Sequence, residues 1–259
     1  MRTLGIDLSA NEQKTGACEI DWPKGTVTFL ARPVKDATLV SHMAEVHMTV
    51  IGIPLGWPDA FVEAVVAHRA GAPWPAADMA PPVDRLPLRF RLTDVTIMAT
   101  GARPLSVSTD RLAVSSMRGA RLQHMARQAG IPIDRSGTGG SVAETYPPEA
   151  LRAWGLNSTG YKGGANAAAA CAVLATELAS RCGPMATSAA LSLDGCDDDA
   201  LDAFICAVMA RAVLLGNTIL PEPDQLETAR HEGWIHVPTA SVEDIVLAAH
   251  VGGAQEGAV

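Results

Sequence analysis

The sequence lacks the features that are typical of disulfide-bonded, zinc-binding and membrane proteins. Its five cysteines are an odd number and include no Cys-x-x-Cys pair, which argues against a disulfide framework and a zinc site. Its seven histidines include no His-Glu-x-x-His motif. The apolar runs near 167–179 and 203–215 are too short or too charged to cross a bilayer, and no leader-like segment opens the sequence. We therefore expect reduced thiols, no membrane contact and a cytoplasmic location.

Basic residues are also scarce, with 20 lysines and arginines against 28 acidic residues and a net charge of −8. This balance argues against broad adhesion to nucleic acid, which depends on neutralising phosphates. The two signs are separated along the chain: residues 84–135 carry nine arginines and four aspartates, whereas residues 194–259 carry twelve acids and two arginines. The arginines could hold an anionic substrate and the acids a divalent cation, although solvated helix faces explain scattered arginines equally well.

The order of the predicted elements indicates an α/β fold. The length of 259 residues and the hydrophobic content of 48% suit one elaborated domain. β-prone runs cover 4–9, 14–21 and 26–32, and the turn at 22–25 predicts an antiparallel hairpin. A five-proline stretch at 72–87 is interpreted as a long functional loop. Other patterns predict strands at 48–53 and 142–146 and helices at 36–47, 58–71, 110–129, 148–154, 165–182 and 198–215.

Two acidic residues lie within apolar strands. Asp7 is in the middle of the 4–9 run, and Glu144 holds a similar position in the run at 142–146. A charge near a core costs on the order of several kcal/mol unless it is paired, hydrogen-bonded or bound to a metal. Both carboxylates therefore need a partner.

The helix at 198–215 adds a second group of acids. Asp199 and Asp202 are three residues apart and share a face, and Asp202 lies at the border of the apolar arc. Capping of the first turn explains Asp197 and Asp198, and it is one of two interpretations for Asp199. It does not explain Asp202, which lies deeper in the helix.

Carboxylates that converge in this way repel one another unless a cation joins them. Hard oxygen ligands with few histidines favour Mg²⁺ or Mn²⁺ over zinc. Two such ions can activate water and stabilise the leaving oxygen in phosphodiester hydrolysis. The spacing alone is a weak signal, because three acids can always be selected from 28.

Six motifs in order resemble those of the family catalogued as domain of unknown function 429, described as predicted ribonuclease H-like nucleases. The similarity runs from about residue 1 to 237. The motifs are Gly5-Ile6-Asp7, Ile53-Pro54-Leu55-Gly56, Arg91-Leu92-Thr93-Asp94, Glu144-Thr145-Tyr146-Pro147, Tyr161-Lys162 and Asp198-Asp199-Ala200-Leu201-Asp202-Ala203.

The resemblance implies a ribonuclease H-like mixed sheet with antiparallel first three strands, flanked by helices. It would form a single domain over 1–240, with a proline-rich insertion at about 72–90 and a C-terminal helix or tail at 241–259. The implied activity is a nuclease that depends on Mg²⁺ or Mn²⁺. Its catalytic acids would be Asp7, Glu144, Asp199 and Asp202, of which Asp7, Glu144 and Asp202 would hold the metal.

The chain departs from the family pattern at one position. Family members commonly have an acid before the Pro-Leu-Gly turn, in an Asp-Ala-Pro-Leu-Gly string, whereas this chain has Gly52 there. Asp59 could substitute only if the loop folded back, which we do not expect. A degenerate ribonuclease H-like binding protein is therefore the main alternative to an active nuclease.

Five further residues are predicted to contact the substrate. Arg91 and Thr93 suit a phosphate oxygen, with Asp94 holding the arginine, although an internal Arg-Asp pair that pins the loop explains them equally well. Tyr146 and Lys162 could add a stacking surface and a charge, or Tyr146 could be a structural plug. The glycine-rich segment 136–141 lacks the lysine of a phosphate-binding loop.

A less favoured enzyme class is a phosphotransferase of the actin and sugar-kinase type, because residues 5–9 resemble its first phosphate motif. Those proteins usually contain two copies of the fold, and no internal repeat is visible in this chain. Nucleic acid is the expected partner. Its type is open between DNA, RNA and a small nucleotide, and a homodimer is also left open.

Overall fold

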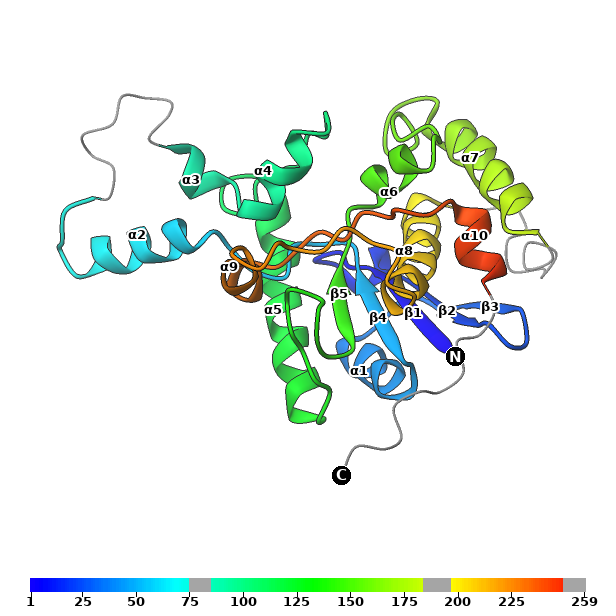
Figure 1. Ribbon diagram of the computed structural model, residues 1–259, viewed down its shortest axis with the longest axis horizontal. Coiled ribbons are helices and arrows are strands. Elements are labelled where there is room, and N and C mark those ends of the chain that lie inside the picture. Colours follow the sequence, from blue (N-terminus) through cyan, green and yellow to red (C-terminus); the bar gives the residue numbers. More distant parts are fainter. Residues whose placement is uncertain (75–84, 184–196, 249–259) are drawn as a thin grey trace.

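The structure, a computed structural model, describes residues 1–74, 85–183 and 197–248 (Figure 1). Most of the predicted proline-rich loop, the end of the predicted C-terminal tail and Cys196 lie outside these ranges. The described chain forms a mixed α/β fold, in which one open sheet of five strands is flanked by helices. This confirms the predicted fold class at that level.

The sheet has the strand order β3-β2-β1-β4-β5. Strand β1 pairs antiparallel with β2, which pairs antiparallel with β3, whereas β4 and β5 run parallel to β1. Ile6 pairs with Ile51, which in turn pairs with Glu144, so β1, β4 and β5 end at the same edge of the sheet. The strands are β1 (Arg2–Asp7), β2 (Gly16–Asp21), β3 (Thr26–Phe29), β4 (Met48–Ile51) and β5 (Val142–Glu144).

The helices predicted from apolar periodicity are all present, with ends that differ by a few residues. They are α1 (Asp36–Glu45), α2 (Asp59–Arg69), α5 (Leu112–Gln128), α6 (Pro147–Ala153), α7 (Ala167–Arg181) and α8 (Asp198–Leu214). A helix also forms in the segment predicted as a C-terminal helix or tail, namely α10 (Val242–Leu247). Two further elements, the 3-10 turn η1 (Glu12–Lys14) and α9 (Leu226–Glu232), were not predicted.

The loop predicted at about 72–90 is wrong at its end, because this part forms the short helix α3 (Leu86–Arg89). A second short helix, α4 (Leu92–Met98), follows it. Pro87 is at the start of α3, where its fixed φ suits a helix and its missing N–H is not needed. Arg91 precedes α4, and the Asp94 side chain accepts a hydrogen bond from the Arg91 backbone N–H. Arg91 and Asp94 therefore cap the N-terminus of α4.

Helix α8 packs directly on the centre of the sheet. All of its residues from Leu201 to Ala212 are buried, so the single apolar arc predicted for it is too narrow. A Cβ atom added to Gly5 would overlap the Ala203 carbonyl oxygen and lie 2.7 Å from the Cys206 carbonyl carbon. The backbones of β1 and α8 therefore meet without an intervening side chain, which brings the acids of α8 close to the end of β1.

Side chains of β1 point alternately to the two faces of the sheet, so the core has one part on each face. Leu4 and Ile6 pack with residues of α1 and α5, including Leu39 and Leu122. Gly5 faces α8, and since successive residues of a strand point to opposite faces, Asp7 lies on the α8 side as well. The other cluster joins α6, α7, α8 and α10 to the sheet.

The four cysteines that the structure describes are buried. Burial raises the pKa of Cys182 to about 12, so this thiol is protonated at neutral pH. Within the described ranges, no helix combines the length and apolar content that a membrane span requires.

Candidate functional site

A pocket of about 590 Å³ opens where β1, β4 and β5 end. In open α/β sheets, ligands typically bind at the carboxyl ends of parallel strands. Acids from β1 and α8 and cations from three other segments line this pocket. They are Asp7, Asp198, Asp199, Lys14, Arg111 and Lys162.

Asp7 has the most perturbed carboxylate of the pocket. Burial raises the pKa of Asp7 well above its usual range, and the negative charges of Asp202, Asp199 and Asp198 raise it further, whereas Lys162 opposes them. None of the described residues donates a hydrogen bond to this carboxylate. Asp7 therefore lies in a group of acids that is short of positive charge.

Asp202 is fully buried and lies deeper in the protein than Asp7, which lines the pocket. The Tyr161 hydroxyl donates a hydrogen bond of 2.9 Å to its Oδ1, and the Lys162 ammonium forms an ion pair with its Oδ2. Burial lowers the pKa of Lys162, but the negative charges of Asp202 and Asp7 outweigh burial and raise it overall. Burial and Asp202 raise the pKa of Tyr161 as well. Both ends of the Asp202 carboxylate are thus occupied by the Tyr161-Lys162 segment.

Glu144 and Arg91 form a second, separate group at the same edge. Arg91 Nη2 and Nη1 lie 2.7 and 2.8 Å from the two Glu144 oxygens, in a bidentate pair. The Leu55 backbone N–H also donates to Glu144, at 2.8 Å. Burial raises the pKa of Glu144, and Arg91 opposes this shift. Both Glu144 oxygens are therefore occupied, although Glu144 was predicted as a metal ligand.

Arg91 has no N–H group left for a substrate. Nε and Nη2 also donate to Asp94, at 3.1 and 3.0 Å, and Nη1 donates to the Glu232 carbonyl at 3.0 Å. All five N–H groups are thus used inside the protein, and the side chain is 1% exposed. The predicted phosphate contact by Arg91 does not fit this geometry, whereas the alternative of an internal Arg-Asp pair does.

The remaining predicted substrate contacts divide into two kinds. Thr93 is buried, and its hydroxyl accepts a hydrogen bond of 2.8 Å from the Ile235 backbone N–H. It therefore holds the segment beside β5. Asp94, Tyr146 and Lys162 all line the pocket, although Asp94 is already paired with Arg91.

Gly52 directly follows β4, next to Asp7. A Cβ atom added here would lie 3.6 Å from Asp7 Oδ1 and 3.2 Å from Cys206 Sγ. An acid at this position would therefore point into the acidic group, which the glycine leaves one carboxylate short. Asp59 does not replace it, since it lies in the first turn of α2, 3.3 Å from His231.

A hard cation needs oxygen ligands that are not already held by other partners. Asp7, Asp199 and Asp202 offer carboxylate oxygens, which suit Mg²⁺ or Mn²⁺. Glu144 does not fit, because both of its oxygens already accept hydrogen bonds, from Arg91 and from the Leu55 N–H, in a buried pair. Across residues 1–74, 85–183 and 197–248, no three His, Cys, Asp or Glu side chains already form a metal site. The acids of β1 and α8 fit a cation only if it shares them with Lys162 or displaces it.

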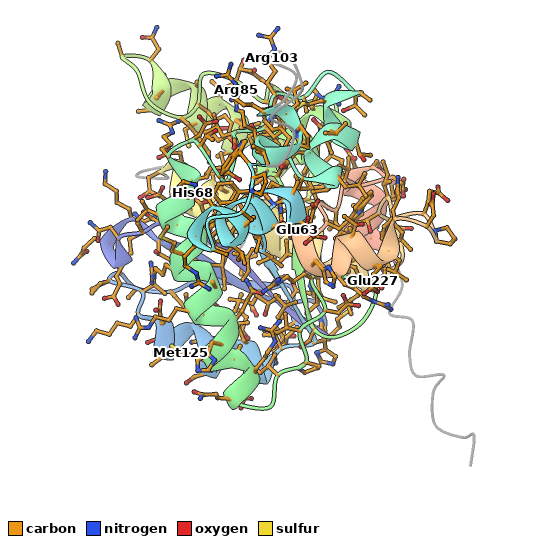
Figure 2. The ribbon with its side chains drawn as sticks, turned by 90° about the vertical axis from the view of Figure 1, so that its left-hand side faces the viewer. Glu63, His68, Arg85, Arg103, Met125 and Glu227 are labelled. Carbon is orange, nitrogen blue, oxygen red and sulfur yellow. The ribbon has the colours of Figure 1, made fainter. Side chains whose placement is uncertain are left out.

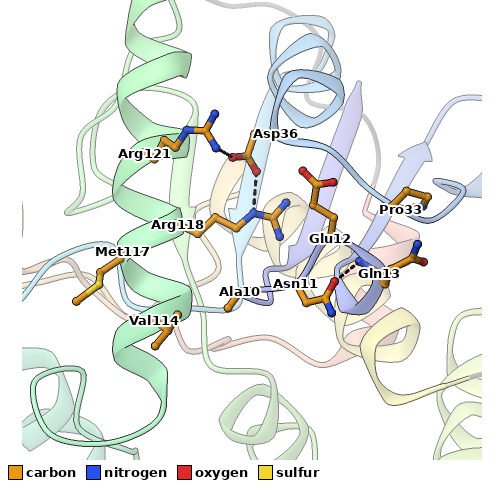
Figure 3. A pocket seen from close by; sticks show the side chains of 10 residues that line it. All are labelled: Ala10, Asn11, Glu12, Gln13, Pro33, Asp36, Val114, Met117, Arg118 and Arg121. Carbon is orange, nitrogen blue, oxygen red and sulfur yellow. Dashed lines mark hydrogen bonds and ion pairs between the residues drawn. The ribbon is translucent and has the colours of Figure 1, made fainter.

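A more open hollow of about 760 Å³ lies between η1 and α5 (Figure 3). Its central cation, Arg118, donates to Asp36 at 2.8 Å and to the Val34 carbonyl at 3.0 Å. Arg121 pairs with the other oxygen of Asp36 at 3.1 Å. These contacts brace α5 against the start of α1, and they pair Arg118 and Arg121 with Asp36 inside the protein.

Sequence reasoning missed three residues of the site. Lys14 and Arg111 line the pocket from η1 and from the residue before α5, and no local pattern distinguishes them from other surface cations. Tyr161 carried a usable signal, because the chain has only two tyrosines and the other, Tyr146, also lies at the pocket.

A family model described as "Protein of unknown function (DUF429)" matches residues 5–226. The matched range contains the end of β1, the whole of β2 to β5 and all the pocket acids named above. No curated protein and no solved structure matches the chain.

Proposed function

The chain belongs to the protein family of unknown function DUF429, and from that premise we propose that it is a ribonuclease H-like nuclease that depends on Mg²⁺ or Mn²⁺. The order of elements supports this fold: three antiparallel strands, a helix, two strands parallel to the first, and a late acidic helix across the centre. The observation that carries the proposal is Asp7, whose carboxylate lies beside the acids of α8 in a pocket without a hydrogen-bond donor of its own.

The proposed ligand set differs from that predicted from the sequence. Asp7 and Asp199 would hold the cation, with Asp202 behind them, and Glu144 is left out because Arg91 occupies it. When bound, Mg²⁺ or Mn²⁺ supplies activation of water and neutralises negative charge on the scissile phosphate. Glu144 and Arg91 instead hold the Leu55 turn and the start of α4 at the pocket wall.

Cations around the pocket mouth favour a phosphate-bearing substrate. Lys14 and Arg111 line the pocket, and Arg111 is exposed. Lys14 and Arg111 suit the backbone of a nucleic acid, since phosphate contacts dominate its affinity. Arg85 and Arg103 are also exposed and lie at one end of the molecule (Figure 2). Tyr146 offers a face for stacking a base.

A panel of DNA and RNA substrates with Mg²⁺ or Mn²⁺ tests this proposal. We expect the wild-type protein to cleave at least one substrate and Asp7→Asn to lose that cleavage. Asp21→Asn is the matched control, because Asp21 lies at the opposite end of β2 and pairs with Lys24. Cleavage that survives Asp7→Asn, or no cleavage by the wild type on any substrate, would contradict the proposal.

A second candidate, a non-catalytic nucleic-acid-binding protein, is favoured by two observations. Arg91 neutralises Glu144, and Gly52 leaves the acidic group one carboxylate short. This candidate predicts salt-dependent binding of nucleic acid that needs no divalent cation and leads to no cleavage. Fluorescence anisotropy with a chelator present, run on the same substrates, separates the two candidates.

A further inference from the structure

We propose that Lys162 is an internal counter-cation that a divalent metal must displace from Asp202, so that this lysine sets the metal affinity of the pocket. The inference rests on the proposed function. It concerns the Lys162 side chain, which lines the pocket and pairs with Asp202.

Lys162 holds the place of a cation among the acids. Its ammonium pairs with Asp202 Oδ2 and is attracted by Asp7, the two carboxylates nearest the centre of the group. Asp202 Oδ1 is already occupied by the Tyr161 hydroxyl. A metal that uses Asp202 therefore needs Oδ2, the atom that Lys162 now contacts.

The attachment of Lys162 differs from that of a structural cation. Its side chain is 42% exposed and lines the pocket, whereas Arg91, with five internal donors, is 1% exposed. Lys162 is also flanked by Gly160 and Gly163, whose φ angles of +77° and +69° suit glycine and whose added Cβ atoms would meet nothing within 4 Å. Apart from the ion pair, the ammonium has a cation–π contact with Tyr161, 5.8 Å from the centre of its ring. Because the side chain is partly exposed, the ammonium can turn toward the pocket mouth.

The displaced ammonium remains useful to the proposed reaction. From the same segment it can reach a substrate phosphate at the pocket mouth, where Lys14 and Arg111 already lie. Metal binding and substrate binding would then support each other, since each draws Lys162 away from Asp202. This coupling makes the lysine a positioning residue for the metal and a contact for the substrate.

Titration with Mn²⁺ alone, followed by isothermal calorimetry, tests the inference. Lys162→Met removes the competing charge, and Lys162→Gln removes it while keeping an N–H donor for Asp202, in case the first variant folds poorly. We expect either variant to bind Mn²⁺ about tenfold more tightly than the wild type, or better, because a unit charge in contact with the ligands is removed. Lys162→Arg, which keeps the charge, should not bind more tightly.

Lys24→Met is the matched control, because Lys24 also pairs with an aspartate, Asp21, at the far end of β2. It should leave Mn²⁺ affinity unchanged, so that a general effect of net charge is separated from a local one. If Lys162→Met and Lys162→Gln bind Mn²⁺ as the wild type does, or more weakly, the inference fails while the proposed cation site stands. If neither the wild type nor any variant binds Mn²⁺, the cation-dependent function fails with it.

Discussion

Replacing Arg91 with methionine removes the one cation that two buried carboxylates share. Glu144 and Asp94 are each 1% exposed, and the Arg91 guanidinium donates two hydrogen bonds to each of them. Removing one partner of a buried ion pair costs about 3–5 kcal/mol, because the other charge is left without compensation. We expect Arg91→Met to lower the free energy of unfolding by at least about 3 kcal/mol at neutral pH.

The assay is urea unfolding followed by circular dichroism at two pH values. In the variant, Glu144 loses the cation that opposes its raised pKa, so the folded state binds a proton more readily than the unfolded chain. The loss of stability should therefore become smaller as the pH falls. Arg230→Met is the matched control, since Arg230 also pairs with a glutamate, Glu227, but the two side chains are 50% and 74% exposed. Exposed pairs contribute about 0–1 kcal/mol.

A double variant separates lost packing from unpaired charge. Arg91→Met combined with Glu144→Gln leaves one buried carboxylate fewer, and we expect it to recover part of the stability that Arg91→Met loses. If Arg91→Met costs less than about 1 kcal/mol, as the exposed control does, the buried pair is not structural and Arg91 is again a candidate phosphate contact.

Three further substitutions test other parts of the structure. Gly5→Ala would push a methyl group into the Ala203 backbone, and we expect a loss of about 3 kcal/mol or more in urea unfolding; a loss under about 1 kcal/mol would contradict the close approach of α8. Gly52→Asp would add a carboxylate beside Asp7, and calorimetry should show tighter Mn²⁺ binding by about tenfold, whereas unchanged affinity would contradict the proposed ligand set. Burial lowers the pKa of His236 from 6.5 to about 4, so the unfolded chain binds its proton first as the pH falls. The stability that neutral His236 contributes is complete above pH 6.5 and is lost toward pH 4, a change of roughly 3 kcal/mol. We expect His236→Gln to abolish this pH dependence when the wild type and the variant are unfolded in urea across the range. Parallel pH profiles of the two proteins would refute the prediction.

The presence of an acid in each of two apolar strands could be predicted from the sequence, because it depends on local patterns. The sequence put Asp7 and Glu144 in the middle of their runs, whereas both strands end at these residues, and parallel strands bring their carboxyl ends to one edge of a sheet. The acids of α8 follow from its first turn and its three-residue spacing. These local features are sufficient to identify most of the pocket acids.

The partners of the acids could not be predicted, because they come from distant segments with no pattern of their own. Arg91 is 53 residues from Glu144, and Lys162 is 40 residues from Asp202. An arginine in a polar motif has the same sequence signature whether it binds phosphate or a buried carboxylate. Only the folded geometry shows that all five of its N–H groups are used internally.

The contact between β1 and α8 also has a consequence for how the pocket can change. Because Gly5 and Gly16 let backbone meet backbone, the distance between the acidic ends of β1 and α8 is determined by main-chain atoms. Side chains at the pocket can then be exchanged one at a time without moving the frame that carries them. A lineage could lose an acid at position 52 and later regain it, or shift from cleaving a ligand to holding it, on an unchanged scaffold. The same property makes this edge of the sheet a suitable place to install a designed cation site.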